Sequence, residues 1–174
     1  MQPITRFTDG LNRVLGWVVG IFLAASSAAV FIQIVIRFVL PLFNVIIAAP
    51  WTEEISRYLM VWVVFIGVAV LCRNFRMIAV EILALLVPRP VGIALKLLSV
   101  AICIGFFAVI VNIGFRWTTM SSIELSPVLR LPMNWVYIAM PVGALIAIFN
   151  LLVVVAETLT GERNLLEGNE EVLD

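Results

Sequence analysis

The sequence predicts an all-α integral membrane protein with four transmembrane helices and a short amphipathic interfacial helix between the second and third. Two observations carry this prediction. The chain of 174 residues is 63% hydrophobic and 13% charged, with a mean hydropathy of +1.16, whereas soluble domains are nearer half apolar and a quarter charged. It also contains four apolar runs, each long enough to cross the roughly 30 Å hydrocarbon core of a bilayer. We therefore expect residues 1–174 to form a single four-helix membrane domain.

The first helix is predicted over about 14–37, after a short polar segment. Its apolar run is too long for the core of a signal peptide, so we expect a retained helix. The connection 38–50 is also apolar, and it either extends this helix beyond the lipid or lies against protein at the interface. Small residues spaced four apart allow close helix packing, or arise by chance in an alanine-rich helix. This stripe consists of Gly16, Gly20, Ala24 and Ala28.

The second helix, predicted over about 51–72, begins with charged residues at the mouth of an apolar run. Thr52 is a plausible N-cap, and the acidic Glu53 and Glu54 suit the positive end of the helix dipole. The dipole disfavours a cation there, so Arg57 needs another explanation. Both acids precede Arg57 by three or four residues and are within reach of its guanidinium. We interpret these residues as an electrostatic cluster that holds the first two helices and a partner in register; the alternative is a helix cap whose charges contact lipid headgroups. The cluster consists of Arg37, Trp51, Glu53, Glu54, Arg57 and Tyr58.

The rest of the chain supplies the interfacial segment and two further spans. The apolar segment of about 77–87 is too short to cross a bilayer, and we expect it to lie in the membrane surface. The third and fourth helices are predicted over about 91–116 and 134–156, with Pro141 bending the early turns of the fourth. An acidic tail, 157–174, follows. Glycines expected at helix contacts are Gly16, Gly20, Gly67 and Gly143. Expected interfacial anchors are Arg73, Arg76, Trp117 and Trp135.

Basic residues predict the orientation, because they are more frequent on the cytoplasmic side of a membrane. With four spans, both termini and the central connection share one side. That side holds Arg6, Arg13, Arg73, Arg76, Arg89, Lys96 and Arg163. The other side holds only Arg37, Arg57, Arg116 and Arg130. We therefore expect both termini in the cytoplasm, with the electrostatic cluster at the outer interface of the membrane.

Composition argues against catalytic chemistry and nucleic-acid binding. The chain has no histidine and a formal net charge of zero, so nothing points to histidine-based catalysis or to a nucleic acid. Its two cysteines, Cys72 and Cys103, lack the spacing of a redox or metal motif. Glu53 and Glu54 are adjacent on a helix and point about 100° apart, so they do not converge on one bond. We expect neither an enzyme nor a bound cofactor or metal.

The predicted spans also lack the groups that a transport pathway needs. Ionisable residues near the midplane mark such pathways, and the central parts of these four helices have none. Their polar residues, Gln33, Asn112 and Asn150, are more typical of hydrogen bonds between helices. We interpret the chain as an accessory subunit of a membrane complex. A self-associating four-helix membrane protein, or a subunit of some other complex, is the alternative.

The ordered motifs resemble the small membrane subunit, DctQ type, of tripartite ATP-independent periplasmic (TRAP) transporters. The strongest match is Trp51-x-Glu53-Glu54-x-x-Arg57-Tyr58, followed by Trp62, Phe65 and Gly67. Further matches are Arg37, Arg73, Ile78-x-Val80-Glu81, Pro88, Leu129 to Pro132, Tyr137 and Pro141-x-Gly143. Two positions depart from the family pattern: Met77 replaces a common histidine, and Glu81 replaces the usual aspartate.

The resemblance implies a function that the residues alone do not. In this family the small subunit binds a large membrane subunit, which carries the substrate and ion sites. A periplasmic substrate-binding protein delivers an organic anion, typically a carboxylate. The resemblance implies that this chain is a non-catalytic scaffold for the large subunit in secondary, ion-gradient-driven transport. Its outer face is a candidate docking surface for the binding protein, and its interfacial residues are expected to contact lipid.

Overall fold

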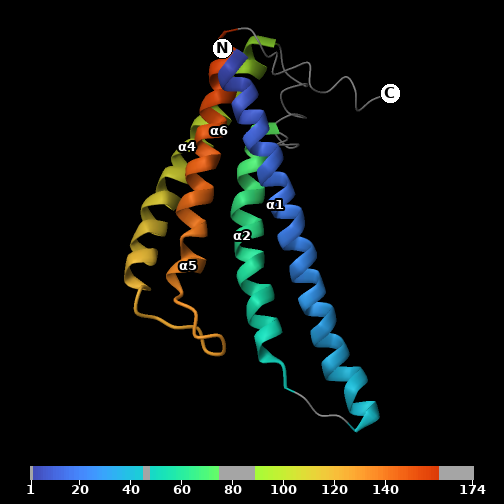
Figure 1. The fold of residues 1–174 in the computed structure, drawn as a ribbon. Coiled ribbons are helices and arrows are strands. Elements are labelled where there is room, and N and C mark those ends of the chain that lie inside the picture. The colour runs from blue at the N-terminus through green and yellow to red at the C-terminus, as the bar shows by residue number, and fades with distance from the viewer. Residues whose placement is uncertain (1, 45–47, 75–88, 161–174) are drawn as a thin grey trace, which may run out of the picture.

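The computed structural model describes residues 2–44, 48–74 and 89–160. This part of the chain is helical and has no strand, and four of its stretches are long and apolar enough to cross a membrane (Figure 1). These findings confirm the predicted fold class in its four spans. The predicted interfacial segment, Arg76 and nearly all of the acidic tail lie outside the described residues. The elements are α1 (Gln2–Ile34), the π-helix η1 (Val35–Val39), the 3-10 helix η2 (Leu40–Phe43), α2 (Pro50–Asn74), α4 (Arg89–Met120), α5 (Asn134–Tyr137) and α6 (Ala139–Leu159).

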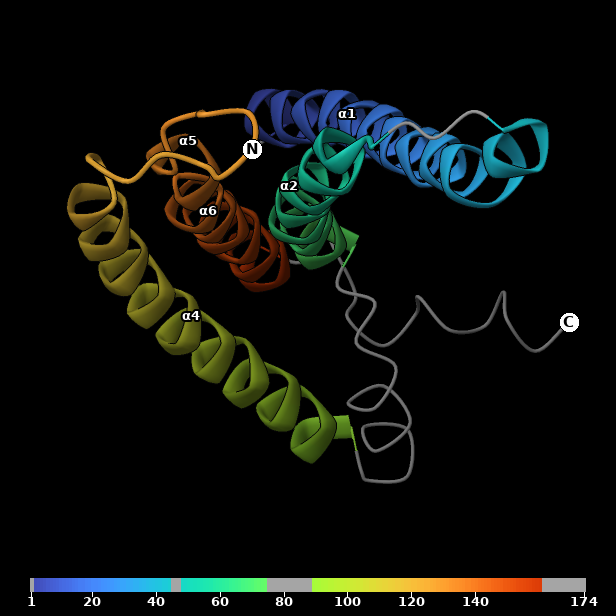
Figure 2. The same cartoon turned by 90° about the horizontal axis from the view of Figure 1, so that it is seen from below.

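The four long helices form a curved row, which Figure 2 shows from below. Helix α2 packs between α1 and α6, and α4 packs on the other side of α6. Helices α1 and α4 are therefore at opposite ends of the row, and each has one face that the other described helices do not cover. Large apolar side chains on these faces are exposed, among them Trp17, Phe31, Ile102 and Phe106. In a membrane these faces contact lipid or another protein.

The first helix begins well before the predicted start at about residue 14. Helix α1 already includes the polar N-terminal turns from Gln2. Thr8 and Asn12 are buried, and Asn12 hydrogen-bonds to Asn150 of α6. These turns are helical because their polar side chains have partners on a neighbouring helix. At the other end the helical path continues through η1 and η2, and Asn44 ends it with a left-handed φ of 57°.

The fourth span is interrupted where proline was expected to disturb it. A break at Ile138 separates the short α5 from α6. Pro141 has no N–H to donate to the preceding turn, so the predicted loosening of the early turns is confirmed. The proline ring packs against Gly114 of α4, where an added Cβ would lie 2.7 Å from the ring Cδ. Gly114 was not among the glycines that the sequence indicated.

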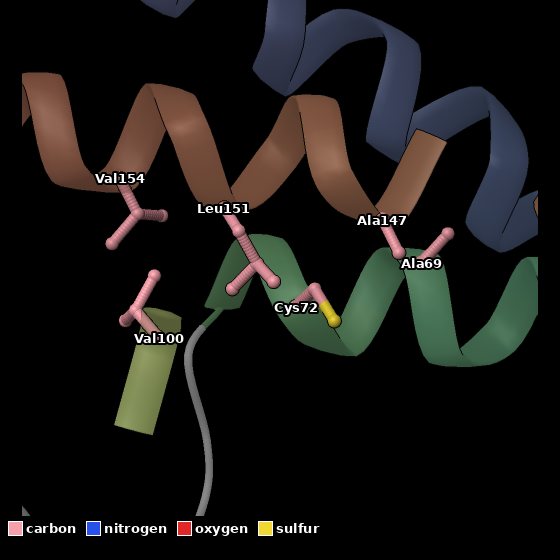
Figure 3. Packing of buried hydrophobic residues seen from close by; sticks show 6 residues of the cluster. All are labelled: Ala69, Cys72, Val100, Ala147, Leu151 and Val154. Carbon is pink, nitrogen blue, oxygen red and sulfur yellow. The ribbon is translucent and has the colours of Figure 1, made fainter. Parts of the chain in front are cut away.

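The core lies between α6 and its neighbours α2 and α4 and is built from small or medium side chains. Ala69 and Cys72 of α2 and Val100 of α4 face one side of α6 (Figure 3). The cluster is completed on α6 itself by Ala147, Leu151 and Val154. Small residues let helix backbones approach closely, which is a main source of helix association in membranes. The closest approach is at Gly143, where an added Cβ would lie 2.6 Å from Cβ of Phe65 and 2.7 Å from its carbonyl oxygen.

Replacing Gly143 with alanine is expected to destabilise the chain by about 1–3 kcal/mol, the usual cost of overpacking. The new methyl group would meet the backbone of α2, which cannot move aside as a side-chain end can. Gly105→Ala on α4 is the matched control, because nothing lies within 4 Å of a Cβ there. Thermal unfolding in detergent measures both variants. Equal midpoints for the two would contradict the close contact between α2 and α6.

Candidate functional site

The two acids at the start of α2 have different partners. Glu53 forms an ion pair with Arg57 at 2.7 Å, and the two side chains are 58% and 70% exposed. Glu54 is buried and accepts hydrogen bonds from the Tyr58 hydroxyl at 2.6 Å and the Leu129 backbone N–H at 2.8 Å. The expectation that both acids reach Arg57 is therefore wrong for Glu54. Because the two acids are adjacent on a helix, they point in different directions and cannot share one partner easily.

Two other expectations for this cluster also need correction. Thr52 is not the N-cap, because α2 begins at Pro50 and the Thr52 hydroxyl donates to the Ala49 carbonyl at 2.7 Å. Proline is favoured in the first helical turn because its missing N–H has no partner there in any case. Arg37 lies near Pro50, but its guanidinium carbon is 5.7 Å from the centre of the Phe38 ring. No ion pair to an acid of α2 is found for Arg37 in the described part of the chain.

Glu54 fastens the loop between α4 and α5 to the start of α2. This loop, residues 121–133, is folded on itself by short-range hydrogen bonds: the Ser126 N–H donates to the Leu131 carbonyl at 2.9 Å, and the Leu131 N–H donates to the Ser126 hydroxyl at 3.1 Å. The bond from Leu129 to Glu54 joins this folded loop to α2. Glu54, which sequence spacing placed in an arginine cluster, thus positions the loop 121–133.

A second polar cluster lies at the opposite end of the helices and was not predicted. Arg73 of α2 forms two parallel hydrogen bonds with Glu157 of α6, at 2.8 and 2.7 Å. Its Nε also donates to Asp9 of α1 at 2.9 Å. The Arg73 and Glu157 side chains are only 7% and 6% exposed. Arg73 was expected to be an interfacial anchor, and the structure places it instead inside a three-helix ion-pair cluster.

Two asparagines form a further link closer to the middle of the helices. Asn12 and Asn150 exchange hydrogen bonds of 2.9 and 2.8 Å between their side-chain amides, and Asn150 also donates to the Ala69 carbonyl at 2.7 Å. Both asparagines are buried. The sequence indicated Asn150 as a residue that bonds between helices. It could not indicate Asn12, because the polar N-terminal segment was not expected to be helical.

The remaining predicted residues lie mainly on surfaces. Gly16 and Gly20 of α1 have nothing within 4 Å of an added Cβ, and Gly67 has only a Val19 methyl at 4.0 Å. Trp51, Trp117 and Trp135 are exposed, with the Trp117 ring 6.0 Å from that of Tyr137. Within the described ranges, no three acidic or cysteine side chains are placed to hold a metal ion. Because Gly16 and Gly20 are open, the small-residue stripe faces away from the other described helices.

These features define a class of protein: a multi-pass membrane protein whose buried polar groups tie helices together and whose end helices have free faces. The chain matches, over residues 26–161, a family model described as the DctQ component of tripartite ATP-independent periplasmic transporters. It belongs to this family and is the small permease component of a TRAP transporter. Its four apolar helices and its family are those of a multi-pass protein of the bacterial inner membrane. A comparison with curated proteins found no match.

Proposed function

We propose that this chain is the non-catalytic scaffold subunit of a secondary, ion-gradient-driven transporter for organic anions, chiefly carboxylates. The observation that carries the proposal is that the buried polar groups bond to other parts of this chain. The pairs Arg73–Glu157 and Asn12–Asn150 bond helix to helix, and Glu54 bonds to the outer loop. Such groups stabilise a fixed arrangement of helices, whereas a pathway would present ionisable groups to a solute. Solute movement then belongs to the large membrane subunit.

The free face of α1 is the surface we assign to that subunit. Gly16 and Gly20 leave a flat strip on it, next to the exposed Trp17. Flat strips of small residues favour close packing with another helix. A self-associating protein without a transport partner would use the same strip, and it is the second candidate.

The orientation follows from the basic residues, with both termini cytoplasmic and the loop 121–133 in the periplasm. This loop is fastened to α2 through Glu54 and has exposed side chains at Ile123, Glu124 and Leu125. A loop that is held in place is suited to docking a partner with little loss of conformational freedom. We propose that it contributes to the surface that receives the periplasmic substrate-binding protein.

Replacing Gly20 with isoleucine is expected to reduce assembly with the large subunit by more than half, while leaving this chain folded. The side chain would project from a strip that is open within the chain, so only a partner would meet it. Gly105→Ile on α4 is the matched control, because an added Cβ is equally open there. Co-purification with the large subunit and thermal unfolding are measured together. Equal assembly of both variants would contradict the assignment of α1 as the partner face.

The scaffold proposal is tested by uptake in reconstituted vesicles. Vesicles with both membrane subunits and the binding protein should accumulate a carboxylate along an ion gradient. Omitting this chain should abolish uptake, because the large subunit loses its support. Robust uptake by this chain alone would contradict the proposal.

A further inference from the structure

An apolar groove runs along the outer half of the helices, between the α1–α2 pair and α5. Its volume is about 610 Å³. Val18 and Phe22 line it from α1, and Trp62 lines it from α2. The rest of its lining is Tyr58, Leu59, Ile66, Leu131, Pro132, Trp135 and Val136. From Tyr58 to Ile66 the groove follows α2 for about 12 Å, close to the roughly 15 Å of one leaflet's hydrocarbon.

The groove meets a smaller, charged hollow at Tyr58. This hollow, of about 210 Å³, lies between the first turns of α2 and the outer loop. Its charged lining residues are Glu53, Glu54 and Arg57. Tyr58 lines both spaces, so the apolar groove and the charged hollow adjoin each other at this residue. The two together have the form of a site for an amphipathic molecule, with its charged end at the level of the outer loop.

We propose that this groove and hollow bind one phospholipid with a zwitterionic amine headgroup. An acyl chain lies along the groove between α1, α2 and α5, and the headgroup lies in the hollow. The phosphate contacts the Arg57 guanidinium, and the ammonium contacts the Glu53 carboxylate. This inference goes beyond the scaffold function and does not depend on it.

The charges of the hollow favour such a headgroup over an anionic one. One bond joins Arg57 Nη2 to Glu53 Oε1, which leaves other guanidinium N–H groups and the second carboxylate oxygen for a ligand. Both side chains are well exposed, so a headgroup can reach them. Glu54 is already engaged by Tyr58 and Leu129, but it adds negative charge beside the hollow. A headgroup with both charges matches this set, whereas a purely anionic headgroup would meet two carboxylates.

The lining of the groove favours an acyl chain. Its one hydroxyl group, on Tyr58, already donates its hydrogen to Glu54. A chain of methylenes needs no further polar partner, and each buried methylene contributes about 0.8 kcal/mol when taken from water. In a bilayer the gain is smaller because tails are already in hydrocarbon, so the headgroup contacts carry the selectivity. The test therefore measures headgroup preference.

The experiment is native mass spectrometry of the full chain, extracted with whatever membrane partner accompanies it. Phosphatidylethanolamine and phosphatidylglycerol with identical acyl chains are added in equal amounts. The unmodified chain should retain one phosphatidylethanolamine in preference to phosphatidylglycerol. Glu53→Gln should lower this preference about threefold, because it removes one partly exposed charge contact of the ammonium. Glu124 is an exposed acid of the loop 121–133 that lines neither space, so Glu124→Gln should leave the preference unchanged.

Two groove-filling variants test the acyl-chain site. Chains carrying Val18→Trp or Leu131→Trp should each lose the retained lipid. Leu131 is in the loop 121–133, where a larger side chain disturbs helix packing least. Val109→Trp, on the exposed face of α4, should keep the lipid. Equal retention of both lipids by the unmodified chain would overturn the proposal. The proposal would also be overturned if neither groove variant changed lipid retention. It would be overturned as well if the groove of the extracted complex held no lipid and filling it broke subunit assembly. Subunit mass and lipid number are read separately, so failure here is distinct from failure of the scaffold proposal.

Discussion

Replacing Arg73 with alanine is expected to destabilise the chain by about 3–5 kcal/mol, the usual cost of breaking a buried ion pair. The change would leave the Glu157 carboxylate buried without its two hydrogen bonds from the guanidinium. It would also remove the link to Asp9, and so the polar connection among α1, α2 and α6 at this end. Thermal unfolding in detergent and the yield of extracted protein measure the effect.

Arg13→Ala is the control for this prediction, because Arg13 is an exposed arginine of α1. It should change stability by less than about 1 kcal/mol, as exposed charges do. The double variant Arg73→Met with Glu157→Leu should recover much of the loss, because apolar residues of similar volume often replace a buried pair well. If Arg73→Ala is as stable as Arg13→Ala, the cluster does not hold the helices together.

Replacing Glu54 with alanine is expected to release the loop 121–133 from the start of α2. The Tyr58 hydroxyl and the Leu129 N–H would both lose their acceptor, and an unsatisfied buried donor costs about 1–3 kcal/mol. The loop should then open more often, and trypsin should cleave after the exposed Arg130 faster than in the unmodified chain.

Glu53→Ala is the matched control for Glu54, one residue away on the same helix. It removes only an exposed ion pair with Arg57, which is worth about 0.2–1 kcal/mol. Tryptic cleavage at Arg130 should stay near the unmodified rate. Identical cleavage of the two variants would show that Glu54 does not fasten the loop. The stronger effect is thus expected at the acid that does not pair with arginine.

The four spans could be predicted from the sequence because their apolar runs match the bilayer thickness. The break near Pro141 could be predicted because a proline lacks an N–H whatever its surroundings. The charged stretch at the start of α2 was also recognisable, because charge beside an apolar run is unusual. These features depend on local composition alone.

The partners of the polar residues could not be predicted, because they depend on which helices become neighbours. Asp9 and Asn12 are in the short polar segment before the predicted first helix, and Glu157 is where an acidic tail was expected. Their helical conformation depends on partners that are 64 to 138 residues away in the chain. At α2, the spacing allowed Arg57 to pair with either acid. The two acids point in different directions around the helix axis, so Glu53 pairs with Arg57 and Glu54 bonds to the loop.

The most direct test of the scaffold assignment is the mass of the native complex extracted into nanodiscs. We expect a complex in which this chain is bound to a much larger membrane protein. We also expect carboxylate uptake to be lost when this chain is removed. A single chain, or an assembly of this chain alone, would contradict the account.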